Sequence, residues 1–318
     1  MANPLPQLPQ QIGYALVAPK LKVLYVPTTK VACSSIKLLL SLSEGSYNQE
    51  ATKIIITPNI SQEQTIHNYR VHGLTRFFDL SEKEQWHIIT SPDWIRIATL
   101  RDPLARAYSS WENRVFLRSP GTPAVIIERS QDVLVAGRID LAATFKNFTL
   151  QFAQDNAAFM IDDHFRPQFN TLYRDQIDYT HVIRVDKPGE MDRLAQILND
   201  RSGKSYRPER LNSGLGIKPI QVYDKETADT MASIYAEDYR WFDFEPHQFT
   251  ATSVSLPLDP LQAALLRNLR ETTERLTYIS RSAFGRVGFR YGLSQLRKSL
   301  WIRITNPKAK GDTRLLQW

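Results

Sequence analysis

The segment from Lys30 to Lys37 reads K-V-A-C-S-S-I-K and places two hydroxyl groups between two ammonium groups. An apolar, β-leaning run at residues 21–27 precedes it, and the apolar residues at 36–40 are spaced as on one face of a helix. The first N–H groups of a helix have no intrahelical partner, and their partial positive charge favours an anion. The segment therefore predicts a phosphate- or sulfate-binding turn, although an ordinary capped helix with solvated lysines would share its pattern. Because it contains no glycine, it disfavours the G-x-x-x-x-G-K-[ST] loop of nucleoside triphosphatases.

A second segment, L-R-D-P-L-A-R-A-Y-S at residues 100–109, also combines a cation with hydroxyl groups. It follows a buried β-like run at 94–100, and Asp102 and Pro103 are typical of the cap and first position of a helix. Ser109 lies about two turns after Asp102, on the face that Arg101 can reach over. A phosphate could bridge Arg101 and Ser109; alternatively, Arg101 pairs with a nearby acid and Ser109 only packs.

Both segments need strands that hold them at one edge of a sheet. A third β-like run at residues 179–185 precedes a helical pattern at 191–198. Strands that alternate with helices favour an α/β fold, with a central parallel sheet flanked by helices and ligands at the carboxyl ends of the strands. The two segments both follow such ends.

Taken together, the two segments resemble the motifs of sulfotransferase family 2, the carbohydrate sulfotransferases that modify chondroitin, dermatan and related glycans. The residues that carry the resemblance are V-P-T-T-K-V-A-C-S-S-I-K at 26–37 and L-R-D-P-L-A-R-A-Y-S-S at 100–110. Residues 163–168, D-H-F-R-P-Q, are similar to the H-W-x-P-Q of that family, and residues 234–242 are similar to its closing Y-x-x-D-Y-x-x-F. The resemblance spans about residues 21–245. Two departures are the Thr28-Thr29 pair between Pro27 and Lys30, and Ile36 in place of a common Trp.

The resemblance implies the P-loop-like sulfotransferase fold and transfer of a sulfuryl group from 3′-phosphoadenosine 5′-phosphosulfate (PAPS) to a hydroxyl group of a carbohydrate or glycolipid. The product of the donor would be 3′-phosphoadenosine 5′-phosphate (PAP), and no metal is implied. Arg101 and Ser109 would hold the 3′-phosphate, and His164 and Arg166 would contact the acceptor. The residues implied to hold the phosphosulfate are Lys30, Val31, Ala32, Cys33, Ser34 and Ser35.

The acceptor proton requires a base, and a histidine suits neutral pH best. His67 and His72 are five residues apart, so on one strand or one helix only one of them would face the site. We expect His72 to be the base, with Lys30 neutralising the leaving phosphate, because heparan-type members use a histidine after the donor loop. An aspartate or glutamate stays an alternative.

The net charge of +7 is concentrated at the end of the chain. Residues 251–318 carry twelve Lys and Arg residues against four acids, so residues 1–250 are nearly neutral. We therefore expect a sulfotransferase domain at 1–250 and a basic amphipathic helical extension at 251–318, with no nucleic-acid partner. The stretch 286–304 is a candidate for peripheral contact with an anionic membrane or for self-association.

The sequence shows no apolar run of about twenty residues and no leader pattern, and its single cysteine, Cys33, cannot form an intrachain disulfide. These features favour a bacterial, cytoplasmic member of the family, with possible contact restricted to the inner membrane face. Two other functions stay open at this point: a nucleotide-dependent kinase with an atypical phosphate loop, and a non-catalytic module that binds anionic glycans.

Overall fold

The computed structural model describes residues 14–54, 62–211, 214–249 and 254–286, with Leu293, Leu296 and Arg297 beyond them. Within these residues, the chain forms a five-stranded sheet of order β3-β1-β2-β4-β7 and a separate hairpin of β5 and β6. The strands are β1 Leu16–Ala18, β2 Val23–Val26, β3 Thr75–Arg76, β4 Ile95–Leu100, β5 Leu134–Val135, β6 Arg138–Ile139 and β7 His181–Arg184.

The α-helices of the first half are α1 Cys33–Glu44, α2 Gln49–Ile54, α3 Tyr69–His72, α4 Glu82–Thr90, α5 Pro103–Trp111, α6 Ala124–Arg129 and α7 Leu141–Gln154. Those of the second half are α8 Asn156–Met160, α9 Gln168–Leu172, α10 Glu190–Ser202, α11 Lys225–Ile234, α12 Ala236–Phe242 and α13 Pro260–Arg286. Short 3-10 turns include η1 Gln62–His67, and a π-helical turn, η3 Glu112–Phe116, continues α5.

The predicted α/β architecture is confirmed, with a mixed rather than wholly parallel sheet. Strands β2, β4 and β7 run parallel to one another, as the three β-like runs predict. Strand β1 is antiparallel to β2 because a tight turn, closed by the Lys22 N–H and the Pro19 carbonyl, joins them. Three residues are too few to show the alternation that reveals a strand, which is why the sequence did not predict β1.

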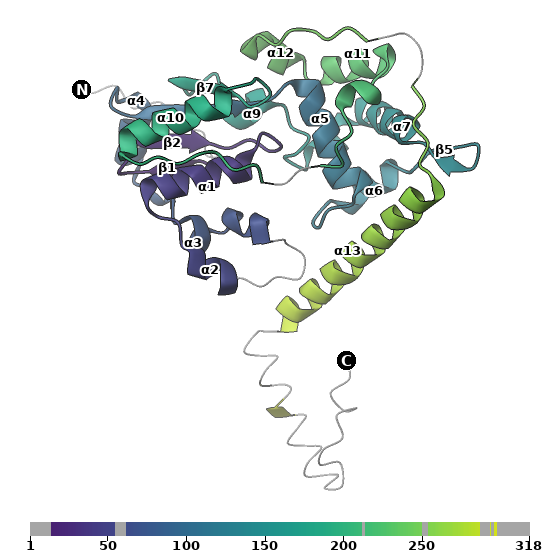
Figure 1. Ribbon diagram of the computed structural model, residues 1–318, viewed down its shortest axis with the longest axis horizontal. Helices are drawn as coiled ribbons and strands as arrows, with labels where there is room; N and C mark the ends of the chain where they lie inside the picture. The colour runs from purple at the N-terminus through teal and green to yellow at the C-terminus, as the bar shows by residue number, and fades with distance from the viewer. Residues whose placement is uncertain are drawn as a thin grey trace.

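Helices cover both faces of the sheet (Figure 1). Side chains alternate between the two faces along a strand. One face packs under α1 and α10 and carries Tyr25, Ile97 and Ile183. Leu24 and Ala98 point to the other face, where they join Ile88 of α4. Strands β2 and β4 are therefore buried on both sides, whereas Val182 of β7 is exposed; the carboxyl ends of the three parallel strands form one edge.

A third core of mainly aromatic side chains lies beside that edge and joins α5, α7 and α11 (Figure 1). Trp111 and Phe145 are fully buried at its centre, with ring centroids 4.9 Å apart. Since α5 begins three residues after β4 ends, this core fixes the direction in which the second predicted segment leaves the sheet.

Part of the expected extension, residues 251–318, packs against this core. Leu266 of α13 is 7% exposed within the aromatic core, and Arg270 forms an ion pair with Asp132. The stretch 286–304 and its expected membrane contact or self-association lie almost entirely outside the described residues and stay predictions. In the described part of the chain, no helix is long and apolar enough to span a bilayer.

Candidate active site

The first predicted segment forms the turn between β2 and α1. Lys30 and Ala32 have positive φ angles of 61° and 57°, a left-handed conformation that costs a non-glycine residue on the order of 1 kcal/mol. Ala32 is the N-cap of α1 and supplies no side-chain hydrogen bond to the helix start. The first N–H groups of this helix therefore have no side-chain cap, and the anion expected there stays a prediction.

Three cationic side chains gather near this helix start without an ion pair in the described part of the chain. They are Lys30, Lys37 and Arg101. Burial lowers the pKa of Lys30 to about 8 and also lowers the pKa values of Lys37 and Arg101. Holding unpaired cations in a partly desolvated place is unfavourable, and an anion bound among them would relieve the cost.

The second predicted segment meets the first because β2 and β4 are adjacent and parallel. Arg101 follows β4 directly, and its Nη1 donates to the Lys30 carbonyl at 3.3 Å. Asp102 caps α5 by accepting from the Ala105 N–H at 2.8 Å, as predicted. Ser109 is half-buried on α5, and its expected contact with a phosphate stays a prediction.

The two other family-like segments, 163–168 and 234–242, fix the backbone of Arg101 through hydrogen bonds. The Gln168 side chain accepts from the Arg101 N–H at 3.0 Å and donates to the Arg101 carbonyl at 2.9 Å. Asp238, which is fully buried, accepts from the backbone N–H groups of Gln168 and Phe169. Segments about 70 residues apart in sequence therefore hold one arginine backbone at the carboxyl end of β4.

Arg106 ties the donor turn to the segment 163–166, and sequence reasoning missed this role. Its guanidinium is 1% exposed and donates to both the carbonyl and the hydroxyl of Thr29, each at 3.0 Å. It also donates to the Arg166 carbonyl at 2.8 Å. The Thr29 hydroxyl donates to the Asp163 carbonyl at 3.2 Å, so the two backbones lie in direct contact beside Lys30 and His164.

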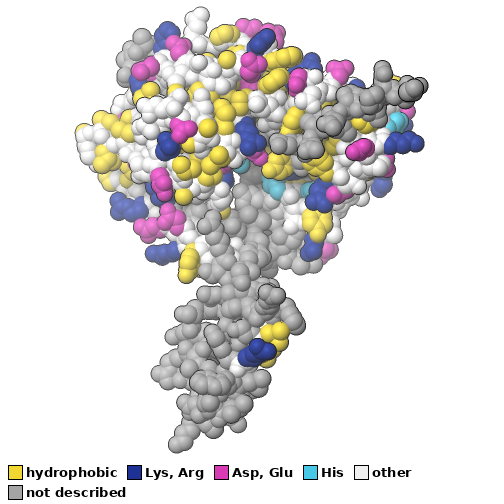
Figure 2. All heavy atoms as spheres, turned by 180° about the vertical axis from the view of Figure 1, so that it is seen from behind, with side chains coloured by type: hydrophobic (Ala, Val, Ile, Leu, Met, Phe, Trp, Pro, Cys, Tyr) yellow, Lys and Arg dark blue, Asp and Glu magenta, His cyan; other side chains and the backbone are white. Residues whose placement is uncertain are grey.

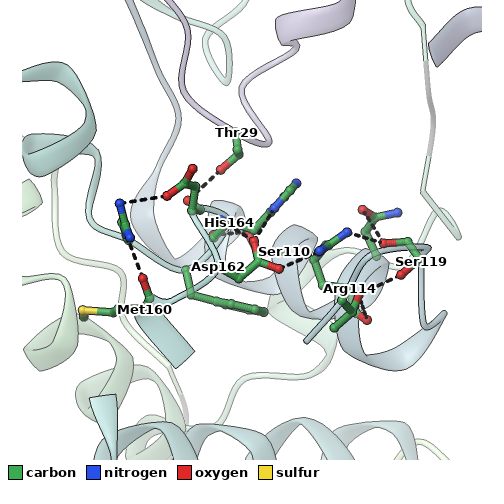
Figure 3. Close-up of polar contacts among 12 residues, drawn as sticks. Thr29, Ser110, Arg114, Ser119, Met160, Asp162 and His164 are labelled. Atoms are coloured by element: carbon green, nitrogen blue, oxygen red, sulfur yellow. Dashed lines mark hydrogen bonds and ion pairs between the residues drawn. The ribbon is translucent and has the colours of Figure 1, made fainter. Parts of the chain in front are cut away.

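His164 is the end of a row of polar contacts shown in Figure 3. Its Nδ1 lies 2.6 Å from Asp162 Oδ1, and Asp162 Oδ2 accepts from Arg114 Nε at 2.8 Å. Burial raises the pKa of Asp162, but His164 and Arg114 outweigh it and hold that pKa well below its usual range. Arg166 is exposed; its Nη1 lies 2.9 Å from Asp163 and its Nε donates to the Met160 carbonyl.

His67 and His72 occupy two separate short elements, η1 and α3, because Asn68 caps α3 between them. The expectation based on one continuous strand or helix is therefore wrong. His67 Nε2 lies 2.9 Å from Ser34 Oγ, and its Nδ1 lies 3.1 Å from Lys37 Nζ. His72 is 3% exposed, and its Nδ1 accepts from the Leu74 N–H at 2.9 Å. Burial first, and the Lys37 charge second, lower the pKa of each ring to about 4.

Glu112 is a second residue that the sequence did not single out. It is 5% exposed in the π-helical turn, and burial raises its pKa despite the nearby charges of Lys30 and Arg101. Its Oε1 accepts from the Leu215 N–H, and the Leu211 N–H donates to Ser35 Oγ. Leu211 therefore contacts the first predicted segment, and Leu215 contacts the π-helical turn that continues α5. The G-L-G pattern at residues 214–216 is the sequence signal that could have marked this part of the chain.

The cationic site contrasts with the outer surface of the body. Figure 2 shows basic and acidic side chains interspersed over one face, in keeping with the near-neutral charge of residues 1–250. The sequence-based expectation that any anion would be bound by a few locally placed residues stays a prediction.

Comparison of the sequence with models of known protein families assigns the chain to one of them. The sequence model of the sulfotransferase family matches residues 14–245, so the chain belongs to the sulfotransferase family. The match ends three residues after α12 and covers every segment that meets at the sheet edge. No curated protein and no solved structure gives a significant match.

Proposed function

We propose that this sulfotransferase moves the sulfuryl group of PAPS to a hydroxyl group of a carbohydrate or glycolipid acceptor. The observation that carries the proposal is the set of three partly buried cations without ion pairs, among the described residues, around the uncapped start of α1. A donor with two separate phosphate groups would use both loops, since Lys30 and Arg101 follow neighbouring strands.

The residues of this chain fit such a donor. The phosphosulfate would be surrounded by N–H and O–H donors of one turn, which comprises Lys30, Val31, Ala32, Cys33, Ser34 and Ser35. The 3′-phosphate would be bound by Arg101 and Ser109. When the S–O bond breaks, negative charge grows on the leaving phosphate, and the Lys30 ammonium is placed to neutralise it.

Thermal unfolding in the presence of PAP, without added metal, tests this function. A PAP concentration of about a hundred times Kd should stabilise the folded state by about 2.7 kcal/mol, because only that state binds it. Mg-ATP at the same concentration serves as the comparison. Stabilisation by Mg-ATP alone would support the kinase alternative, and no shift with either nucleotide would leave a glycan-binding module.

Replacing Arg101 with alanine should weaken PAP binding roughly ten- to hundred-fold, because a charge-assisted hydrogen bond contributes about 1.5–3 kcal/mol. Isothermal titration calorimetry measures the change. Arg76→Ala is the matched control, since Arg76 is an exposed arginine paired with Asp79. Unchanged affinity in Arg101→Ala would exclude this side chain from the donor site.

Binding of PAP should also take up protons near pH 8. With a pKa of about 8, Lys30 is about half uncharged at that pH, and a bound anion would raise its pKa and complete the protonation. Affinity should therefore fall as the pH rises above 8. Calorimetry in two buffers of different ionisation enthalpy measures the uptake, and Lys30→Arg should abolish it. Identical binding enthalpies in both buffers for the wild-type protein would contradict this expectation.

A further inference from the structure

The hydrogen bonds of the three histidines near the donor loop fix which ring nitrogen carries the proton. A backbone N–H and an ammonium can only donate, so Nδ1 of His72 and Nδ1 of His67 are acceptors. Both neutral rings therefore carry their proton on Nε2 and have their basic nitrogen already engaged. Neither ring can accept another proton without losing a buried hydrogen bond.

His164 has the opposite arrangement. The Asp162 carboxylate can only accept, so Nδ1 of His164 carries the proton and Nε2 keeps its lone pair. The described part of the chain offers no hydrogen bond to that Nε2. The ring is 27% exposed, which is enough for a substrate to reach it.

The backbone around His164 is fixed as firmly as its ring. Ser110 Oγ donates to the His164 carbonyl at 2.8 Å, and the His164 N–H donates to Asp162 Oδ1 at 3.0 Å. Arg106 and Thr29 hold the adjoining residue, Asp163, against the donor turn. The ring is thus held beside Lys30, whose charge it feels.

Resting on the function proposed above, we propose that His164 is the general base of the sulfuryl transfer, and that Asp162 and Arg114 are the residues that position it. Nε2 of His164 takes the proton of the acceptor hydroxyl group. At the same time, the oxygen of that hydroxyl group forms the new bond to sulfur. The bond from sulfur to the phosphate oxygen breaks, and its electron pair leaves with PAP. The carboxylate of Asp162 stabilises the imidazolium until the proton passes to water.

Burial, helped by two nearby cations, keeps the ring neutral at the pH where it must act. Burial lowers the pKa of His164 most; Asp162 opposes this, whereas Arg114 and Lys30 lower the pKa further. His67, from η1, also interacts with the ring electrostatically. Activity should therefore rise with pH through a pKa below 6.5 and reach a plateau near neutral pH, where the base is unprotonated.

The remaining histidines lie outside the contacts that join the donor turn to residues 162–166. His87 is exposed on α4, and His181 begins β7 at the amino end of the strand, away from the edge that holds Lys30. His247 bonds to Asp102 but lines a different cavity of about 470 Å³ together with Tyr239 and Arg240. Glu112 is the competing carboxylate, and its raised pKa makes it the necessary comparison.

Kinetics of PAP release from PAPS, with chondroitin oligosaccharides or with water as acceptor, test the proposal. His164→Gln should lower kcat by about 10²- to 10⁴-fold with PAP affinity kept within about threefold, and should remove the acidic limb of the pH profile. His164→Ala should regain activity with added imidazole, a response that a merely structural role would not give. Asp162→Asn should lower kcat and move the acidic limb to lower pH, because the imidazolium loses its carboxylate.

His72→Ala and Glu112→Gln are the matched variants, and each should keep the acidic limb. Loss of that limb in either variant, with its retention in His164→Gln, would overturn the proposal. NMR of the PAP complex with isotope-labelled histidine gives an independent readout that needs no acceptor: His164 should show a proton on Nδ1 alone at neutral pH, and a proton on Nε2 would exclude it as the base. If PAP fails to bind the wild-type protein, the proposed function itself is wrong.

Discussion

Lys30→Ala should lower kcat for PAP release from PAPS by about 10²-fold and change the KM for PAPS by less than about threefold. The leaving phosphate gains charge only as the S–O bond breaks, so the ammonium contributes most in the transition state. Alanine is the right replacement because it keeps the Cβ and hence the left-handed backbone at φ 61°, whereas glycine would release strain as well as charge.

The control is Lys22→Ala, since Lys22 is an exposed lysine paired with Asp93 at the other end of β2. That variant should keep both kinetic constants. A KM that rises in Lys30→Ala as much as kcat falls would show that the lysine binds the ground state of the donor instead.

The sequence predicted the central strands and the loops that follow them. Residues 21–27, 94–100 and 179–185 contain β2, β4 and β7. The first two runs are nearly continuous in apolar residues because β2 and β4 are buried on both faces. The cap pair Asp102-Pro103 placed the start of α5 correctly because capping depends on adjacent residues alone. Such local signals do not reveal β1 and β3, whose pairing depends on distant partners.

Only the part of the site that lies in the two motifs could be predicted from the sequence. Two loops at neighbouring strand ends follow from the pattern, and the structure brings Arg101 to Lys30 as that pattern implies. The histidines were not predictable in the same way. His67 is held by Lys37 of α1, thirty residues away, and the turn that brings the Leu74 N–H to His72 leaves no periodic signal. Periodicity could not anticipate the break at Asn68 that separates the two.

Arg106 shows why the place of a cation in a motif does not by itself give its role. It lies about one helical turn after Arg101 and Asp102, in the segment that resembles a phosphate-binding motif, yet the structure buries it among backbone carbonyls. The sequence marks the cation, and only the fold decides whether that cation faces a ligand or the protein interior.

Arg106→Met should therefore destabilise the protein and disrupt the donor site together. The thioether side chain fills part of the space but leaves the Thr29 and Arg166 carbonyls without their donors. Unsatisfied buried groups cost about 1–3 kcal/mol each, so we expect a loss of about 3–5 kcal/mol and a fall in Tm on the order of 10 °C. PAP affinity, measured by calorimetry below the unfolding transition, should fall at least tenfold, because Thr29 precedes Lys30 and no longer holds the turn.

Arg96→Met separates the two effects. Arg96 is also buried, at 7% exposed, and donates to the backbone carbonyls of Asp178, Ser91 and Trp94. It lies near the amino end of β4, away from the edge that binds the donor. Its replacement should cost a comparable amount of stability and leave PAP affinity unchanged. Equal losses of affinity in both variants would show that the donor site responds to overall stability, and that Arg106 has no particular role in holding the turn.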